Sequence, residues 1–144
     1  MKHYGAVAEF SRERSDDLMR AYDEYFSTCR YIRMNEVYSA IVNMPSARFW
    51  VSEKRAGVVL YAIMRGENVL QNMRPTKRDM YEEIYSRTMR LRKENPHLSV
   101  EELCATVLCQ PAPKFYLAPG SAKAIVCKAR KEWIRRKHQR LRLL

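Results

Sequence analysis

Hydrophobic residues recur every three or four positions through most of this chain, and the segments between these stripes are short and polar or proline-containing. Such spacing is typical of amphipathic helices that bury one face. It predicts helices over residues 11–28, 34–44, 52–65, 76–94, 99–109 and 120–140. The boundaries have local signals: Ser99 and Glu102 form a capping-box pattern, and Pro45 and Pro111 each follow a predicted helix. We therefore expect an all-α fold.

The helical pattern is duplicated at an offset of 66 residues, since the segment 36–64 resembles the segment 102–130 without a gap. Both segments contain the same ordered pattern, at 45–51 and at 111–117. A proline is followed by two variable residues and then by a cation, a phenylalanine, a second aromatic residue and an aliphatic residue. A repeat of this kind indicates one supersecondary unit used twice. Within these two segments the identical pairs are Glu36/Glu102, Pro45/Pro111, Phe49/Phe115 and Ala56/Ala122.

Each copy is predicted to contain three helices, which gives a first trihelical repeat at 1–66 and a second at 67–144, joined by the linker 66–75. A unit of this size can barely enclose a hydrophobic core by itself, so we expect the two repeats to share apolar surface. The β-prone segments 48–51 and 114–117 are too short for more than a minimal two-stranded antiparallel ribbon, which a twofold relation between the copies would allow. Their aromatic residues are expected mainly in the core, with base stacking as the alternative.

The positive charge is concentrated at the C-terminal end of the chain. The whole chain carries a net charge of +11, and residues 123–144 hold nine Lys/Arg against one acidic residue, whereas residues 1–44 hold six against seven. Localised positive charge is typical of proteins that bind a polyanion, with nucleic acid ahead of an anionic membrane. A solvated helix that is merely rich in cations is the alternative.

The last predicted helix should pack one face against the protein and present cations on the others. Its apolar line is expected to run through Ala122, Ile125, Val126, Ala129, Trp133 and Ile134. Membrane binding is disfavoured, because only a small apolar face would be available to a membrane, formed by Trp133, Ile134 and the tip with Leu141, Leu143 and Leu144. The candidate phosphate contacts are Lys123, Lys128, Arg130, Lys131, Arg135, Arg136, Lys137 and Arg140, followed by Arg142.

Other kinds of site have little support in the sequence. The chain has four glycines and no phosphate-binding glycine loop, and no nucleophile and base occur together in a motif. Cys104 and Cys109 would lie about 140° apart around a helix, which disfavours a shared metal ion, so we expect buried, reduced cysteines. We predict no enzymatic activity, no cofactor and no metal. The beginning of the sequence lacks the apolar stretch of a signal peptide, and we expect a cytoplasmic protein.

The second and third helices of each copy, joined through P-x-x-[RK]-F-[WY]-[VL], resemble the helix-turn-helix units of trihelical DNA-binding proteins of phages and mobile elements. The connection, 45–51, is about twice as long as the three or four residues usual in that family. The resemblance implies that each third helix would read bases through its N-terminal end. In the first copy this end would hold Ser52, Glu53, Lys54 and Arg55, and Glu53 would repel phosphate, which makes this copy the poorer reader. In the second copy Ser121, Lys123 and Lys128 would lie on the corresponding helix.

The sequence thus predicts a nucleic-acid-binding accessory or regulatory protein, with double-stranded DNA as the expected partner. RNA presents the same phosphates and is not distinguished from DNA. The alternative is a protein-interaction or assembly module, which would bind a protein partner or a second copy of itself and have no specific nucleic-acid role.

Overall fold

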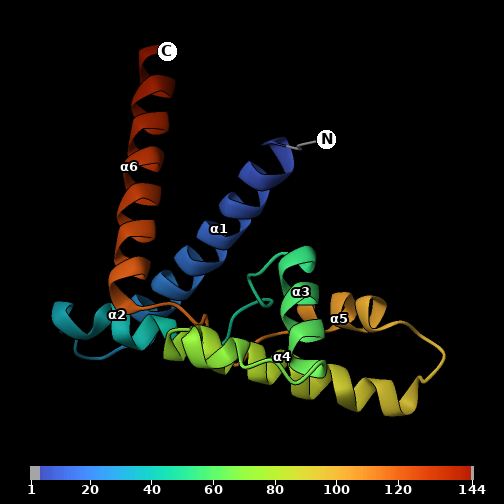
Figure 1. Ribbon diagram of the computed structural model, residues 1–144. Helices are drawn as coiled ribbons and strands as arrows, with labels where there is room; N and C mark the ends of the chain where they lie inside the picture. The colour runs from blue at the N-terminus through green and yellow to red at the C-terminus, as the bar shows by residue number, and fades with distance from the viewer. Residues whose placement is uncertain (1–3, 144) are drawn as a thin grey trace. The chain divides into compact units, whose positions relative to one another are not determined.

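The computed structural model describes the backbone of residues 4–143 and the side chains of residues 10–143. Within this part of the chain it is all-α, with six α-helices and one short 3-10 helix (Figure 1). The elements are α1 Tyr4–Thr28, α2 Met34–Val42, α3 Glu53–Met64, η1 Val69–Asn72, α4 Pro75–Glu94, α5 Val100–Leu108 and α6 Pro119–Leu143. The all-α prediction is confirmed, and every predicted helix is present.

The helix ends follow the local signals in the sequence. The Ser99 hydroxyl accepts a hydrogen bond from the Glu102 N–H at 3.2 Å, and Ser52 accepts one from the Arg55 N–H at the same distance. Each bond satisfies a donor that the first turn of a helix leaves free. Gly66 follows α3 with a φ of 81°, a conformation that residues with a side chain rarely adopt.

The helices form two compact units whose composition does not follow the order of the chain. One unit comprises residues 1–44 and 118–144, with α1, α2 and α6, and the other comprises residues 45–117, with α3, α4 and α5. The predicted division into 1–66 and 67–144 therefore does not coincide with these units. The third helix of each predicted copy packs with the first two helices of the other copy, since α6 contacts α1 and α2 while α3 contacts α4 and α5.

The connection between the second and third helix explains this exchange. A tight turn would return the third helix onto its own copy, as in a short helix-turn-helix. Here Pro45 and Pro111 are each followed by several non-helical residues before the next helix begins. This length allows the chain to leave one unit and enter the other.

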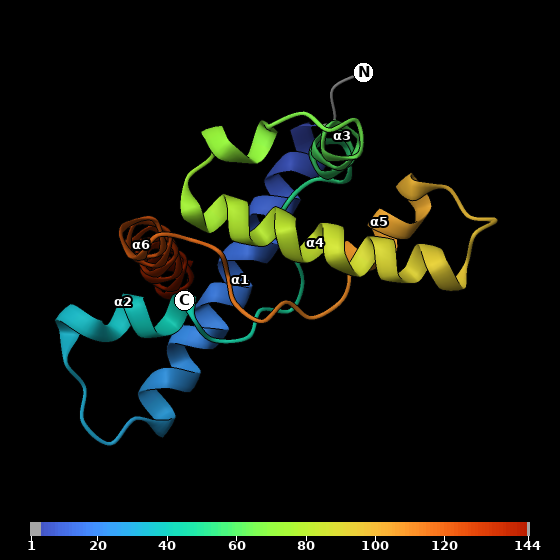
Figure 2. The ribbon, with the colours of Figure 1, turned by 60° about the horizontal axis from the view of Figure 1, so that its bottom comes forward.

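The unit of residues 45–117 has a continuous hydrophobic core between α3, α4 and α5. Figure 2 shows α5 beside the C-terminal part of α4 in this unit. Phe49 and Ile84 are fully buried in this core, together with Val107 and Leu108. Arg87 lies over the Phe49 ring, 5.0 Å from its centroid, and donates a hydrogen bond of 3.0 Å to the Pro111 carbonyl. Arg87 thus connects α4 to the segment that follows α5.

The unit with α1, α2 and α6 has a smaller core. Its fully buried residues include Leu18 and Ala21 of α1, Val37 and Ile41 of α2, and Val126 of α6. An aromatic cluster borders this core, in which the Tyr22 ring lies 4.6 Å from Phe26 and 6.4 Å from Tyr38, centroid to centroid.

Several buried positions of the two predicted copies coincide at the offset of 66 residues. Both residues are buried in each of these pairs: Leu18/Ile84, Val37/Leu103, Ile41/Val107, Phe49/Phe115, Ala56/Ala122 and Leu60/Val126. The similarity between the copies thus includes core positions in all three of their helices.

The predicted ribbon of residues 48–51 and 114–117 is wrong in position and extent. One antiparallel bridge joins Ser46 to Ala112, and no strand occurs in the described residues. Proline lacks an N–H to donate to a ladder, and Pro111 and Pro113 flank the bridge. Farther along, Tyr116 has a left-handed φ of 57°, which interrupts an extended strand.

The prediction that Phe49 and Phe115 belong to the core is confirmed, since both are buried. Trp50 and Tyr116 follow them one residue later and are half-buried. Each has a cation over its ring, Arg48 at 5.3 Å from the Trp50 centroid and Lys114 at 5.3 Å from that of Tyr116. The cation–aromatic pair thus recurs at equivalent positions of the two copies.

Candidate nucleic-acid interface

The helix α6 carries most of the predicted contact residues, and its sequence explains its length. Pro119 occupies the first turn, where its missing N–H costs nothing, and the segment from residue 127 onward consists mostly of strong helix formers. Arg140 and Arg142 lie in the last turn, where positive charge favours the helix dipole. The helix is therefore three residues longer at its C-terminal end than the predicted 120–140.

Only the first half of α6 packs against α1 and α2. Ala122 and Val126 are buried, and Ile125 and Ala129 are half-buried. The predicted apolar line does not continue to Trp133 and Ile134, which are 64% and 47% exposed. The reason is geometric: α1 and α6 diverge toward the two ends of the chain, so α1 does not cover α6 beyond its middle (Figure 1).

The predicted cations of α6 are all exposed. Successive residues of an α-helix are rotated by about 100°, so the positions of side chains around α6 follow from their numbers. Lys128, Lys131, Arg135 and Arg142 fall within an arc of about 60° that lies opposite the buried Ala122 and Val126. We call these four residues the outer row. Lys131, Arg135 and Arg142 also line one open surface depression with Ile134, His138 and Gln139.

Carboxylates neutralise little of this charge. Among the residues whose side chains are described, Arg135 is the α6 cation with an ion pair, to Glu132 of the same helix at 2.7 Å. The acidic residues of α1 form their described ion pairs within α1, where Arg20 binds Asp17 and Glu24. The positive charge of α6 is therefore available to an external anion.

Two further α6 cations have aromatic partners. Arg130 lies over the Tyr22 ring, 5.8 Å from its centroid, and donates a hydrogen bond of 3.4 Å to the Tyr22 hydroxyl. Lys137 lies over the Trp133 ring at 5.1 Å. Arg130 thus fastens α6 to α1, which makes it a structural residue first and a candidate contact second.

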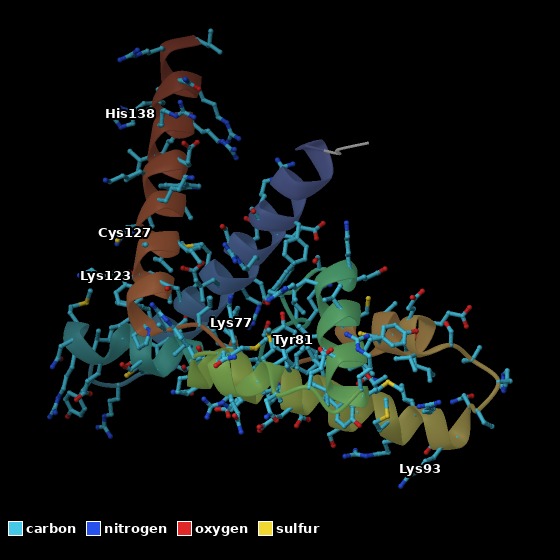
Figure 3. The ribbon with its side chains drawn as sticks, viewed as in Figure 1. Lys77, Tyr81, Lys93, Lys123, Cys127 and His138 are labelled. Carbon is cyan, nitrogen blue, oxygen red and sulfur yellow. The ribbon has the colours of Figure 1, made fainter. Side chains whose placement is uncertain are left out.

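The remaining predicted residues do not belong to the outer row. Lys54 and Arg55 are exposed at the start of α3, in the unit of residues 45–117, whereas Lys123 lies near the start of α6. Burial raises the pKa of Tyr81, and the positive charge of Arg55 partly offsets this effect. Figure 3 shows Lys123, Cys127 and His138 along α6, and Tyr81 in the other unit. The structure thus unites the α6 cations and leaves Lys54 and Arg55 in a separate compact unit.

The cysteines are free and occupy different environments. Cys104 is buried, and burial, with a smaller effect of Glu53, raises the pKa of its thiol from the usual 9.0 to about 11. Cys109 is exposed, so the prediction of buried cysteines is right for Cys104 and wrong for Cys109. In the described residues no group of three or more His, Cys, Asp or Glu side chains is arranged to hold a metal ion.

No family model, curated protein or solved structure shows a significant match to this chain. Across residues 4–143, no helix has both the length and the apolar character needed to cross a membrane. The assignment of a function therefore depends on the arrangement of the residues themselves.

Proposed function

We propose that this chain is a non-enzymatic, duplicated helix-turn-helix-like protein that binds double-stranded DNA, and that it acts as an accessory or regulatory factor of a phage or mobile element. The observation that carries the proposal is the outer row of α6. Its four cations project away from the helix packing, three of them have no carboxylate partner among the described side chains, and the fourth has only Glu132. Such a row binds phosphates and releases their counterions.

The neighbouring contacts support the same proposal. Arg130 and Tyr22 hold α6 in place at its middle, so the outer row is presented on a fixed helix. Lys123 extends the positive surface toward the packed end of α6. Lys54 and Arg55, which are exposed, would supply a second contact at the start of α3.

The proposal is tested with a fluorescently labelled duplex of arbitrary sequence at moderate salt. The variant combining Lys128→Gln, Lys131→Gln, Arg135→Gln and Arg142→Gln should bind about tenfold or more weakly than the wild type. The matched control removes four exposed cations from α4, by Lys77→Gln, Arg90→Gln, Arg92→Gln and Lys93→Gln. Equal losses in both variants would mean that only net charge matters, and the outer row would not be the contact surface.

A protein-interaction role is the second candidate, and one surface favours it. Tyr31, Ile32 and Met34 are 78%, 42% and 58% exposed in and just after the short connection between α1 and α2. Exposed apolar residues that cluster in this way are typical of interaction sites. If this is the main function, the wild type should self-associate in light scattering, Tyr31→Ser with Ile32→Ser should abolish the self-association, and the duplex should not be retained.

A further inference from the structure

We propose that the free end of α6 enters the major groove of B-form DNA, and that cations on two opposite faces of this helix contact the phosphates of both groove walls. This inference rests on the proposed function and specifies its geometry. The helix-turn-helix resemblance implies that DNA is contacted by the N-terminal end of a recognition helix. The inference made here is that the C-terminal end of the long helix α6 makes this contact instead.

The first argument is exposure on every face. All residues from Trp133 to Leu143 are exposed, whereas the first half of α6 has buried and half-buried positions. These eleven residues form three turns of helix, about 16 Å long. A helix with its side chains is about 10–12 Å wide, and the major groove of B-form DNA is about 12 Å wide. A free helical end of this kind therefore matches the width of the groove.

The second argument is the distribution of charge around the helix. Arg136, Lys137 and Arg140 form a second row, centred about 155° around α6 from the outer row. A helix that rests on the outside of a nucleic acid needs cations on one face only. A helix inside a groove meets phosphates on both sides, which is the arrangement that the two rows match.

The third argument concerns apolar residues between the two rows. Ile134 and Leu141 are seven residues apart, so they lie on one line of the helix, and they are 47% and 60% exposed. A line of this kind would face the floor of the groove, where apolar side chains contact the thymine methyl group. The single acidic residue of α6, Glu132, precedes this end of the helix and is paired with Arg135.

The same distribution argues against an anionic membrane surface. A helix that lies in a membrane interface needs one wide apolar face with its cations on the other. In the free end of α6 the two rows leave no such face, because cations lie on both sides of Ile134 and Leu141. Double-stranded RNA fits poorly for another reason, since the major groove of an A-form helix is too narrow for side chains to read.

The groove assignment is tested with the full-length wild type, a short labelled DNA duplex and an RNA duplex of the same sequence. Methyl green, which occupies the major groove, should displace the protein, and netropsin, which occupies the minor groove, should not. The RNA duplex should bind about tenfold or more weakly. Displacement by netropsin alone, or equal affinity for RNA and DNA, would overturn the groove assignment and leave nucleic-acid binding intact. Failure to bind either duplex would overturn the proposed function itself.

The two rows are tested separately. Arg136→Gln, Lys137→Gln and Arg140→Gln remove the second row, and Arg135→Gln with Arg142→Gln remove the two outer-row cations that lie in the free end of α6. Glutamine favours helix nearly as well as lysine and arginine, and all five positions are exposed, so helicity by circular dichroism should not change. The slope of log affinity against log salt should fall by about 2.7 in the triple variant, the loss of three phosphate contacts, and by about 1.8 in the double variant, the loss of two. An unchanged slope after removal of the second row would show that only one face docks.

Discussion

Ser46 and Ala112 pair through two backbone hydrogen bonds, from the Ser46 N–H to the Ala112 carbonyl at 2.9 Å and from the Ala112 N–H to the Ser46 carbonyl at 3.0 Å. These residues occupy equivalent positions of the two copies, 66 residues apart. Both are buried, at 2% exposure. The connections that exchange the third helices are thus joined to each other at one matched point.

This pairing predicts that Ala112→Pro is strongly destabilising. Proline removes the N–H that donates a hydrogen bond to the Ser46 carbonyl, and the loss of a hydrogen bond costs about 0.5–1.5 kcal/mol. Ala112→Val is the matched control, since it adds similar bulk and keeps the N–H. Urea denaturation should place the proline variant below the valine variant by that amount. Equal stability of the two variants would show that bulk alone is responsible.

The contact of Arg130 with Tyr22 predicts a coupling between α6 and α1. A double-mutant cycle with Arg130→Gln and Tyr22→Leu should give an interaction free energy of about 0.5–1 kcal/mol in unfolding experiments. Lys128→Gln, which changes an exposed cation without such a partner among the described residues, should leave stability unchanged. Additive effects of the two substitutions would mean that the contact does not stabilise the packing of α6.

The buried Cys104 thiol predicts a loss of stability at high pH. Its pKa is about 11 in the folded protein against 9.0 for an ordinary thiol, so between these values the unfolded chain releases a proton that the folded chain retains. The stabilisation is complete below pH 9 and is lost as pH rises toward 11, by at most about 3 kcal/mol. Cys104→Ala should therefore show a weaker pH dependence of the free energy of unfolding in this range than the wild type, and an equal pH dependence of the two proteins would contradict this assignment.

The same environments predict the reactivity of the two thiols. Because the thiolate is the reactive form and Cys104 is buried, a thiol reagent should label Cys109 in the native protein well before Cys104. Mass spectrometry of the labelled peptides measures the order. Equally fast labelling of Cys104 would show that α5 opens readily.

The sequence predicted the helices because their signals are local. Ser52 and Ser99 cap α3 and α5, and Gly66 follows α3 in a left-handed conformation. Several apolar residues that repeat at the offset of 66 residues are buried in both copies. This is expected because the residues that form the core of a repeated unit must repeat with it. The exchange of the third helices was not predictable in this way, because Ala56 and Ala122 look alike and nothing local indicates which copy each of them packs against.

The candidate site was predicted in part. The cations of α6 could be identified from the sequence alone. The residue at which α6 stops packing against the rest of its unit could not. Trp133 continues the apolar spacing of Ala122, Ile125, Val126 and Ala129 and still lies 64% exposed, because the divergence of α1 and α6 is a property of the tertiary structure. The distinction between Arg130, held by Tyr22, and the outer row likewise requires the position of a residue from another helix.

The salt dependence of duplex binding tests the central claim most directly, because it counts the phosphates that the protein neutralises. The wild type should show a linear fall of log affinity with log salt, and removal of the four outer-row cations should make the slope less steep by about 3.6. The α4 control variant should keep the slope of the wild type. A slope that is the same in the wild type and the outer-row variant would contradict the assignment of this face of α6 to DNA.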